Sequence, residues 1–458
     1  MSPHPANRWT IALPVLVGSA ALAACIVVFF PGWLSYDSSF QFWQARTGEF
    51  SNLSPVVMSA LWRVVYTIWP SPAAMLILHL VAYWTGIVLL ALQLCRHVFA
   101  RVAFILGIGF LPPAMLILAH LWTDTSLIAA MSLAFGLTVT GLRRLRALPL
   151  ALALPVILYA GAVRHNSLLA IIPLCLLWAQ ACFRVHAGTR PAAAKTSRRA
   201  MVVGIALLVV LGSFSVGRTL DHLLARERVS TWAIGALWDL AGISLRSGTL
   251  VVPELARTDG TDLASLREKY SPYVGVPLFE GAGRIRHGLG DEVFSSDELA
   301  LLRRAWLAAI VAHPLSFAQH RLAVTTRLFG SYRSHPEGLF FTPTVVPYRD
   351  NPPAEAALSG VRDTLVEQIR RTRGWLMFTP ALYLVLAAGA TAWGWQRRRD
   401  PFGRIALAFA GSGLLLVLPL TVFAPSAELR YCGWLFTSSL VALIACGATH
   451  RSVHRRDW

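Results

Sequence analysis

The chain of 458 residues is 55% hydrophobic and only 14% charged, with a mean hydropathy of +0.56. Soluble globular domains carry about 25% charged residues, so this composition excludes an ordinary soluble protein and indicates lipid as the solvent. The net charge of +18 could suggest a nucleic-acid partner, but lysine and arginine occur mostly in short clusters between apolar runs. Loop charge orients membrane proteins in this way, and we expect no nucleic-acid partner.

Ten apolar stretches reach or approach the length of about 20 residues that a helix needs to cross a bilayer. They lie near 11–30, 73–94, 101–120, 123–142, 147–163, 167–183, 200–217, 374–395, 403–423 and 430–448. The pattern predicts an all-α polytopic membrane protein with about ten transmembrane helices. We expect a tight turn at residues 164–166, because three polar residues in mid-bilayer would be costly.

Alternating the ten stretches across the membrane puts the cations of one set of loops all on the same side, whereas the other short loops hold few. These cations are Arg8, Arg96, Arg101, Arg143, Arg144, Arg146, Arg184, Arg190, Lys195, Arg198, Arg199, Arg397, Arg398, Arg399, Arg404, Arg451, Arg455 and Arg456. The positive-inside rule then places both termini in the cytoplasm, and we expect a bacterial inner membrane. The first stretch has no clear cleavage site, which favours a retained signal-anchor.

Two long segments remain on the outer face. In residues 31–72, the stretch 38–46 could form an amphipathic helix with Phe40 and Trp43 on one face, and 55–69 is apolar but too short to span. Both are expected as interfacial helices. Residues 218–373 should form a mainly helical periplasmic domain, with helices at 297–312, 315–329 and 361–372. The predicted organisation is therefore an N-terminal membrane domain 1–217 with a catalytic first outer loop, the domain 218–373, and a C-terminal membrane domain 374–458.

Four outer loops each place an ionisable group at the membrane surface. Asp37 follows the first stretch, Asp124 begins the fourth, Arg164-His165-Asn166 joins the fifth and sixth, and Glu428 and Arg430 join the last two. A carboxylate there could act as a general base on an acceptor hydroxyl. Arginines there could bind a phosphate with two hydrogen bonds. No nucleotide-binding or zinc motif occurs in the sequence.

A plain structural role has to be weighed for each of these loops. Charged residues commonly cap spanning helices, and Trp and Tyr commonly anchor at the interface, which explains any one loop taken alone. Asp37 is different, because it lies between aromatic residues and directly before an expected amphipathic helix, with a second interfacial helix behind it. That arrangement could form the wall of a cleft, which a helix cap does not need.

The first outer loop resembles that of a known enzyme family. Ser35-Tyr36-Asp37-Ser38-Ser39-Phe40-Gln41, followed by Gly48-Glu49-Phe50 and by 54–62 (SPVVMSALW), looks like the first outer loop of the GT-C glycosyltransferases, in the protein O-mannosyltransferase-like and aminoarabinose-transferase-like group. Trp122-Thr123-Asp124 and Arg164-His165-Asn166 look like the second and third outer loops of bacterial members. The resemblance covers roughly residues 10–185, and its motifs are short.

The resemblance implies an enzyme that moves a sugar from a polyprenyl-phosphate carrier to a glycan, lipid or protein acceptor on the outer face. It implies Asp37 as the base or acceptor-orienting residue and Asp124 as a second acid. The substrate-binding candidates are Tyr36, Arg164, His165, Asn166, Glu428 and Arg430, with the arginines on the lipid phosphate. No metal site is predicted and no cofactor is certain, and the sequence leaves open whether a divalent cation assists.

Two other classes of protein fit part of the pattern. A polysaccharide polymerase or ligase also has many spans, a large outer segment and glycan-binding arginines, for which Arg327, Arg333 and Arg349 are available. A transporter or flippase would carry charged or broken helices at mid-membrane. The span centres here hold almost no charge, although Pro112-Pro113 and Pro155 interrupt two of them.

Overall fold

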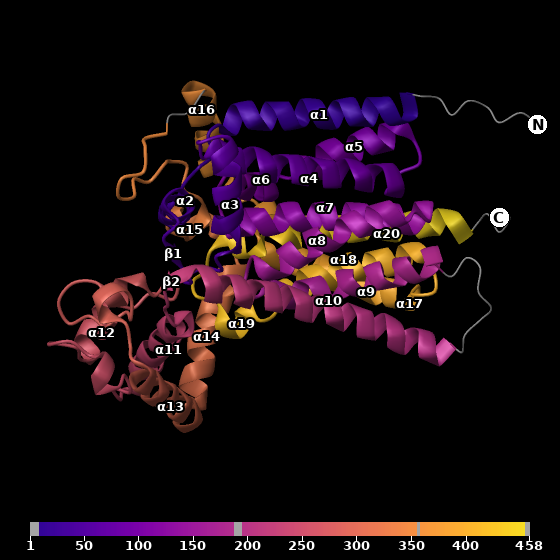
Figure 1. Cartoon of the computed structure of the whole chain (residues 1–458). Helices are drawn as coiled ribbons and strands as arrows, with labels where there is room; N and C mark the ends of the chain where they lie inside the picture. The colour runs from indigo at the N-terminus through magenta and orange to yellow at the C-terminus, as the bar shows by residue number, and fades with distance from the viewer. Residues whose placement is uncertain (1–8, 187–194, 355–357, 454–458) are drawn as a thin grey trace, which may run out of the picture.

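The computed structural model describes residues 9–186, 195–354 and 358–453 (Figure 1). Of the cations assigned to the cytoplasm, Arg8, Arg190, Arg455 and Arg456 lie outside the described residues, as do the side chains of Lys195 and Arg451. The described chain is nearly all helical and forms a long helical bundle with a lobe at one end (Figure 1). We call this end of the bundle the lobe end.

The bundle contains helices from both ends of the chain. Its N-terminal part is α1 (Trp9–Phe29), α4 (Ala73–Leu94), α5 (Val98–Gly109), α6 (Pro112–Leu118), α7 (Thr123–Arg144), α8 (Ala147–Ala162), α9 (Ser167–His186) and α10 (Lys195–Leu224). Its C-terminal part is α17 (Pro380–Gln396), α18 (Pro401–Val417), α19 (Leu420–Phe423) and α20 (Gly433–Val453). Every stretch predicted to span is helical, and α10 continues past the expected boundary at residue 217.

Within the described residues, seven helices are long and apolar enough to cross a membrane, or eight if the bent pair α5 and α6 is one span. This makes the chain a polytopic helical membrane protein by length and composition. The axes of α5 and α6 differ by 59°, and the break falls at Pro112-Pro113, where the ring of proline ends one helix and starts the next. The two remaining expected spans, α8 and α17, have 16 and 17 residues.

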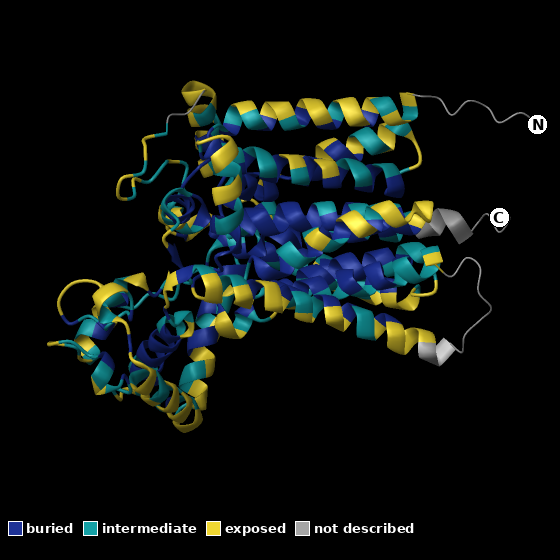
Figure 2. Ribbon diagram, viewed as in Figure 1, coloured by how far each residue is buried: buried dark blue, intermediate teal, exposed yellow. Residues whose placement is uncertain are grey.

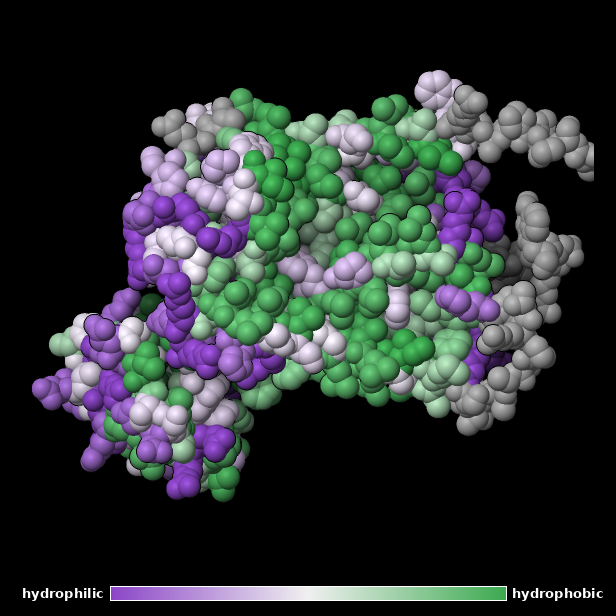
Figure 3. Space-filling view, in the orientation of Figure 1, coloured by the Kyte–Doolittle hydropathy of each residue, from purple (hydrophilic) through white to green (hydrophobic). Residues whose placement is uncertain are grey.

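The surface and interior of the bundle agree with that assignment. Hydrophobic residues cover the bundle between two hydrophilic ends on the face that Figure 3 shows. The helix α7 lies at the centre of the bundle (Figure 2), and 83% of its 18-residue apolar segment is buried. The same share is 22% for α1 at the periphery. Glycine lets α4 approach α7 closely, because a Cβ at Gly86 would collide with the backbone of Ser132.

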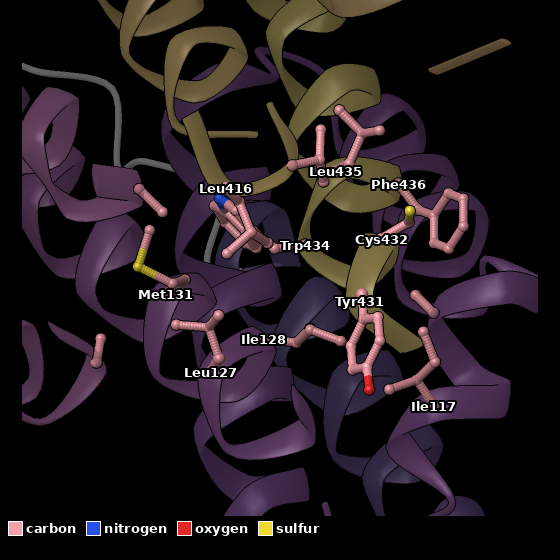
Figure 4. Packing of buried hydrophobic residues seen from close by; sticks show 14 of the residues in the cluster. Ile117, Leu127, Ile128, Met131, Leu416, Tyr431, Cys432, Trp434, Leu435 and Phe436 are labelled. Carbon is pink, nitrogen blue, oxygen red and sulfur yellow. The ribbon is translucent and has the colours of Figure 1, made fainter. Parts of the chain in front are cut away.

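The core near the lobe end is packed by side chains of α6, α7, α18 and α20. Figure 4 shows Tyr431 between Ile117 and Ile128, with Trp434 and Leu435 one turn further along the chain. The ring of Trp434 lies near Phe135, and its Nε1 donates to Ser412 Oγ of α18 at 2.9 Å. The segment that enters α20 is therefore fixed by the core beneath it.

Helices form at the lobe end in both places where interfacial helices were expected. They are α2 (Tyr36–Thr47) and α3 (Val57–Ile68), and the rings of Phe40 and Trp43 stack on one face of α2 as expected. The amphipathic pattern expected for 38–46 is not seen, because α2 buries residues on all of its faces. Between them, β1 (Phe50–Ser51) pairs in parallel with β2 (Ala225–Glu227), which follows α10. This pairing ties the first loop of the chain to the start of the lobe.

Residues 231–329 build the lobe, and residues 331–372 lead from it back across the bundle end. The α-helices are α11 (Thr231–Ser247), α12 (Leu263–Lys269), α13 (Ser296–Ala312), α14 (Pro314–Phe329), α15 (Glu337–Phe340) and α16 (Ser359–Thr372). The 3₁₀ turns of this part are η1 (Glu254–Ala256), η2 (Val276–Phe279), η3 (Gly290–Glu292) and η4 (Tyr332–Ser334); two more, η5 (Leu376–Phe378) and η6 (Leu429–Cys432), precede α17 and α20. Three of these helices match the expected ranges, whereas α11 was not anticipated.

Candidate functional site

The four loops that the sequence singled out meet at the lobe end of the bundle. They bring together five ionised side chains that are far apart in the sequence: Asp37, Asp124, Arg164, Glu428 and Arg430. We call this group the bundle-end cluster. The loops join different pairs of helices, so only the packing of the bundle places these side chains in contact.

Backbone hydrogen bonds fix the segment that leads to Asp37. Trp33 bonds on both sides to the chain at residues 119 and 121, with N···O distances of 2.9 and 3.0 Å. Leu34 pairs in the same way with residues 344 and 346 of the returning segment. The helix α2 then begins at Tyr36, so Asp37 lies in its first turn, where the helix dipole stabilises a carboxylate.

Arg430 is the centre of the bundle-end cluster. Its Nη2 donates to Asp37 Oδ2 at 2.7 Å, and its Nε lies 2.5 Å from Glu428 Oε2 and 4.0 Å from Asp124 Oδ2. The guanidinium also lies over the ring of Trp122, with 4.9 Å between its carbon and the ring centroid. Arginine suits this position because its planar fork can bind several acceptors and stack on an aromatic face at once.

Arg164 joins the second and third of these loops. It forms an ion pair with Asp124, its Nη1 donates to Thr123 Oγ1 at 3.3 Å, and its Nε donates to Asn166 Oδ1 at 3.2 Å. Asn166 in turn donates to the carbonyl of Leu416 on α18 at 3.4 Å. The expected turn at 164–166 is present, and its role is to orient Arg164 toward the cluster.

Aromatic and hydroxyl side chains surround the charges. The ring of Tyr431 lies beneath both guanidiniums, at 5.2 Å from Arg164 and 5.4 Å from Arg430. Ser426 Oγ donates to Glu428 Oε1 at 2.6 Å, and Trp122 Nε1 donates to Ser35 Oγ at 2.7 Å. These contacts restrict the side chains to one arrangement, as a preorganised polar site requires.

Exposure differs sharply within the cluster. The side chain of Asp37 is 53% exposed, whereas Arg430 is 13% and Asp124 is 4% exposed. Three carboxylates face two guanidiniums, so the cluster carries one excess negative charge. Within the described part of the chain, Oδ1 of Asp37 makes no hydrogen bond or ion pair, which leaves this oxygen free to accept a proton.

Two predicted site residues lie apart from these charges. Tyr36 is largely exposed and packs edge-on against Tyr348, with 5.4 Å between ring centroids. His165 is exposed, and besides Arg164 its charged neighbours are Asp221 and Arg218 of α10. The geometry brings neither ring into contact with Asp37 or Arg430.

No metal centre accompanies the cluster in the described ranges, where no three or more His, Cys, Asp or Glu side chains are arranged to hold an ion. The carboxylates of the bundle-end cluster instead surround a guanidinium. Their contacts are those of an ion-pair network.

Sequence reasoning missed a second ionic group, inside the lobe. Asp239 of α11 contacts both His320 Nε2 at 3.1 Å and Arg321 Nε at 2.7 Å, and it accepts from Trp306 Nε1 at 3.1 Å. Tyr270 lies 2.9 Å from the other ring nitrogen of His320. We call Asp239, His320 and Arg321 the lobe cluster. The only signal in the sequence was a single acid within the apolar helix 231–245.

The lobe cluster also attaches the lobe to the bundle. Arg321 Nη1 donates to the carbonyl of Ala424, just beyond α19, at 2.9 Å, and the Ala427 amide donates to the Tyr273 carbonyl at 2.7 Å. Burial lowers the pKa of His320, although the Asp239 carboxylate opposes this. Its imidazole is therefore neutral near pH 7, and Arg321 supplies the positive charge that Asp239 needs.

Comparison of the chain with family models, with curated proteins and with solved structures found no match.

Proposed function

We propose that the chain is a membrane glycosyltransferase that moves a sugar from a polyprenyl-phosphate carrier to a glycan, lipid or protein acceptor. The observation that carries this proposal is the state of Asp37. One of its oxygens is fixed by Arg430 and the other is free, at a bundle end where a lipid-linked donor would present its sugar. A positioned carboxylate of this kind can act as a general base.

The proposed reaction breaks the bond between the anomeric carbon of the sugar and the phosphate oxygen of the carrier. The acceptor hydroxyl oxygen forms the new bond to that carbon, and its proton passes to Asp37. The electron pair of the broken bond leaves with the phosphate as polyprenyl phosphate. Guanidinium groups near the leaving oxygen stabilise its developing charge, which is the role proposed for Arg164 and Arg430.

The observed ion pairs add one requirement to this mechanism. Arg430 is paired with Asp37 and Glu428, and Arg164 is paired with Asp124, so a donor phosphate has to compete with carboxylates. Exchange of Asp37 for phosphate on Arg430 would free the carboxylate for the acceptor. We propose this exchange as the step that links donor binding to the availability of the base.

The topology proposed with this function has ten spans, in a bacterial inner membrane, with both termini cytoplasmic and residues 218–373 periplasmic. Counting the bent pair as one span and adding α8 and α17 to the seven long helices gives this number. A helix of 16 residues is about 24 Å long, which is short of the bilayer core but close enough with local thinning. A reporter active only outside should work within 218–373 and fail after Arg146, Arg199 or Trp458, the last of which lies outside the described residues.

Purified full-length protein with synthetic donors tests the activity. Wild type should transfer sugar from a polyprenyl-monophosphate donor, and Asp37→Asn should lower the rate by about 10²- to 10⁴-fold, the usual contribution of general-base catalysis. Asp363→Asn is the matched control, because Asp363 is an exposed carboxylate on α16 and should leave the rate unchanged.

Near-native transfer by Asp37→Asn would remove Asp37 as the base. A wild type inactive with every monophosphate donor but active with diphosphate-linked oligosaccharides would identify a polymerase or ligase instead. A wild type inactive with both donor classes would contradict the enzyme assignment and leave the transporter or flippase class.

A further inference from the structure

A second polar feature lies at the lobe end. A cavity of about 480 Å³ lies where the end of α16 meets η4 and the turn that leads into α17. Four arginines, one glycine and one tryptophan line it: Arg333, Arg370, Arg371, Arg373, Gly374 and Trp375. We call it the arginine pocket.

Only two of the four arginines are neutralised. Arg370 binds both oxygens of Glu337, at 2.8 to 3.2 Å, and Arg371 binds Glu367 at 2.9 Å. In the described ranges of the chain, neither Arg333 nor Arg373 pairs with a carboxylate. The arginine pocket therefore has an excess of two positive charges, and like charges are gathered without a protein anion to balance them.

The absence of a side chain at Gly374 makes room for Arg333 beside the other three arginines. The stem of Arg333 packs directly on Gly374, where a Cβ would lie 3.2 Å from both Cβ and Cγ of the arginine. Arginines in the last turn of α16 also offset the helix dipole, which accounts for Arg370 and Arg371 without a ligand. Arg333 comes from η4, a different element, so the helix dipole does not account for its position.

The pocket borders a surface suited to lipid. Trp375 is 57% exposed and Leu376 of η5 is 66% exposed, and the next helix, α17, exposes 70% of Val385. Tryptophan at the end of a membrane helix anchors at the level of lipid headgroups. A phosphate in the pocket would thus lie at headgroup depth, with apolar surface on α17 for the attached chain.

We propose that the arginine pocket binds the phosphate group of a membrane lipid. Guanidinium groups bind phosphate with paired, charge-assisted hydrogen bonds, and the two excess charges match a phosphate monoester, which carries about −1.5 to −2 near pH 7. The volume exceeds what one phosphate needs and leaves room for the linking part of a headgroup. The inference is independent of sugar transfer, because binding is measured without any sugar donor.

The test measures lipid binding by the full-length chain in a neutral detergent, by native mass spectrometry and thermal shift. The probes are dioleoyl phosphatidate, dioleoyl phosphatidylcholine and inorganic phosphate. Arg333→Gln with Arg373→Gln removes the two unpaired charges and breaks no ion pair. Arg303→Gln with Arg304→Gln removes two exposed arginines of α13, in the part of the lobe far from α16 (Figure 1), and is the matched control.

Wild type and the control should bind phosphatidate in preference to phosphatidylcholine, and the pocket variant should bind it at least about tenfold more weakly, because charge-assisted bonds are lost. Competition by millimolar inorganic phosphate would show that the phosphate alone is recognised, and its failure would show that the lipid chain contributes. Equal phosphatidate binding by wild type and the pocket variant would overturn the proposal. An equal loss in the control would overturn it as well. If the double variant does not elute as a single species, the single variant Arg373→Gln is measured in its place.

Discussion

The protein contains two groups of acidic and basic side chains that are similar in composition and different in setting. The bundle-end cluster has three carboxylates and two guanidiniums, and its Asp37 is half exposed. The lobe cluster has one carboxylate between an arginine and a histidine, and Asp239 and His320 have no exposed surface. Each cluster includes tryptophan and tyrosine neighbours, so the type of residue alone does not distinguish them.

Among the described residues, the two clusters differ in whether they leave a carboxylate oxygen without a partner. Both carboxylate oxygens of Asp239 have partners, which are Trp306, Arg321 and His320. Arg321 also donates a hydrogen bond to the main-chain carbonyl of residue 424. Such a group holds two parts of a fold together, and it is costly to break because its charges are buried. Asp37 keeps one oxygen free beside an excess of negative charge, as the proposed role of general base requires. Four stability measurements test the roles of these groups and of two residues outside them.

The largest expected effect is on the lobe cluster. Asp239→Ala leaves Arg321 buried without its counter-charge and should lower the free energy of unfolding by about 3–5 kcal/mol. Thermal unfolding in detergent, with limited proteolysis of residues 231–329, measures this. Asp297→Ala in the exposed first turn of α13 is the control and should cost under about 1 kcal/mol. Equal stability of the two variants would show that the lobe cluster is not structural.

The second effect is a dependence of stability on pH, from His335. Burial is the main cause that lowers its pKa from 6.5 to about 4; the charges of Arg327 and Arg373 act in the same direction, and backbone hydrogen bonds to Arg327 and Ser331 oppose them. The unfolded chain takes up a proton below pH 6.5, whereas the folded His335 stays neutral until about pH 4. The folded state therefore has its full stability above pH 6.5. Its free energy of unfolding should fall by up to about 3 kcal/mol as the pH is lowered from 6.5 to 4.

Melting temperatures at pH 7.5, 6, 5 and 4.5 measure this slope. His335→Asn should flatten it, since the variant has no group that titrates there. The same slope in wild type and His335→Asn would assign the pH dependence to other groups.

A smaller effect should come from crowding against His320. A Cβ at Gly242 of α11 would lie 2.5 Å from His320 Cγ, so Gly242→Ala should cost about 1–3 kcal/mol through overpacking. Gly235→Ala on the same helix is a close control, because no atom lies within 4 Å of its Cβ position. It should be neutral or stabilising by up to about 1 kcal/mol. A melting temperature of Gly242→Ala at or above that of Gly235→Ala would contradict the tight packing.

The smallest effect on stability should come from Asp37. Its ion pair with Arg430 is solvent-exposed on the Asp37 side, so Asp37→Asn should change the free energy of unfolding by under about 1 kcal/mol. Unfolding and transfer are measured on the same preparation, so that a large loss of rate with unchanged stability identifies a functional group. A destabilisation as large as that of Asp239→Ala would place Asp37 with the structural ion pairs.

The class of the fold follows from the sequence alone. A run of about 20 apolar residues has few alternatives to a membrane helix, because its backbone must satisfy its own hydrogen bonds in lipid. Helices near 38–46 and 55–69 and three helices of the segment 218–373 were also predicted from the local sequence. The turn at 164–166 followed from the cost of burying polar groups.

Which ionised groups meet depends on the packing of the helices. Asp37 and Arg430 are 393 residues apart, and nothing local in either loop specifies that Arg430 contacts Asp37 and Glu428 while Arg164 contacts Asp124. The lobe cluster and the arginine pocket likewise join elements that are distant in the chain. Helix periodicity is a property of neighbouring residues, whereas a site depends on how helices pack, and that packing is set by many contacts such as those around Gly86 and Trp434.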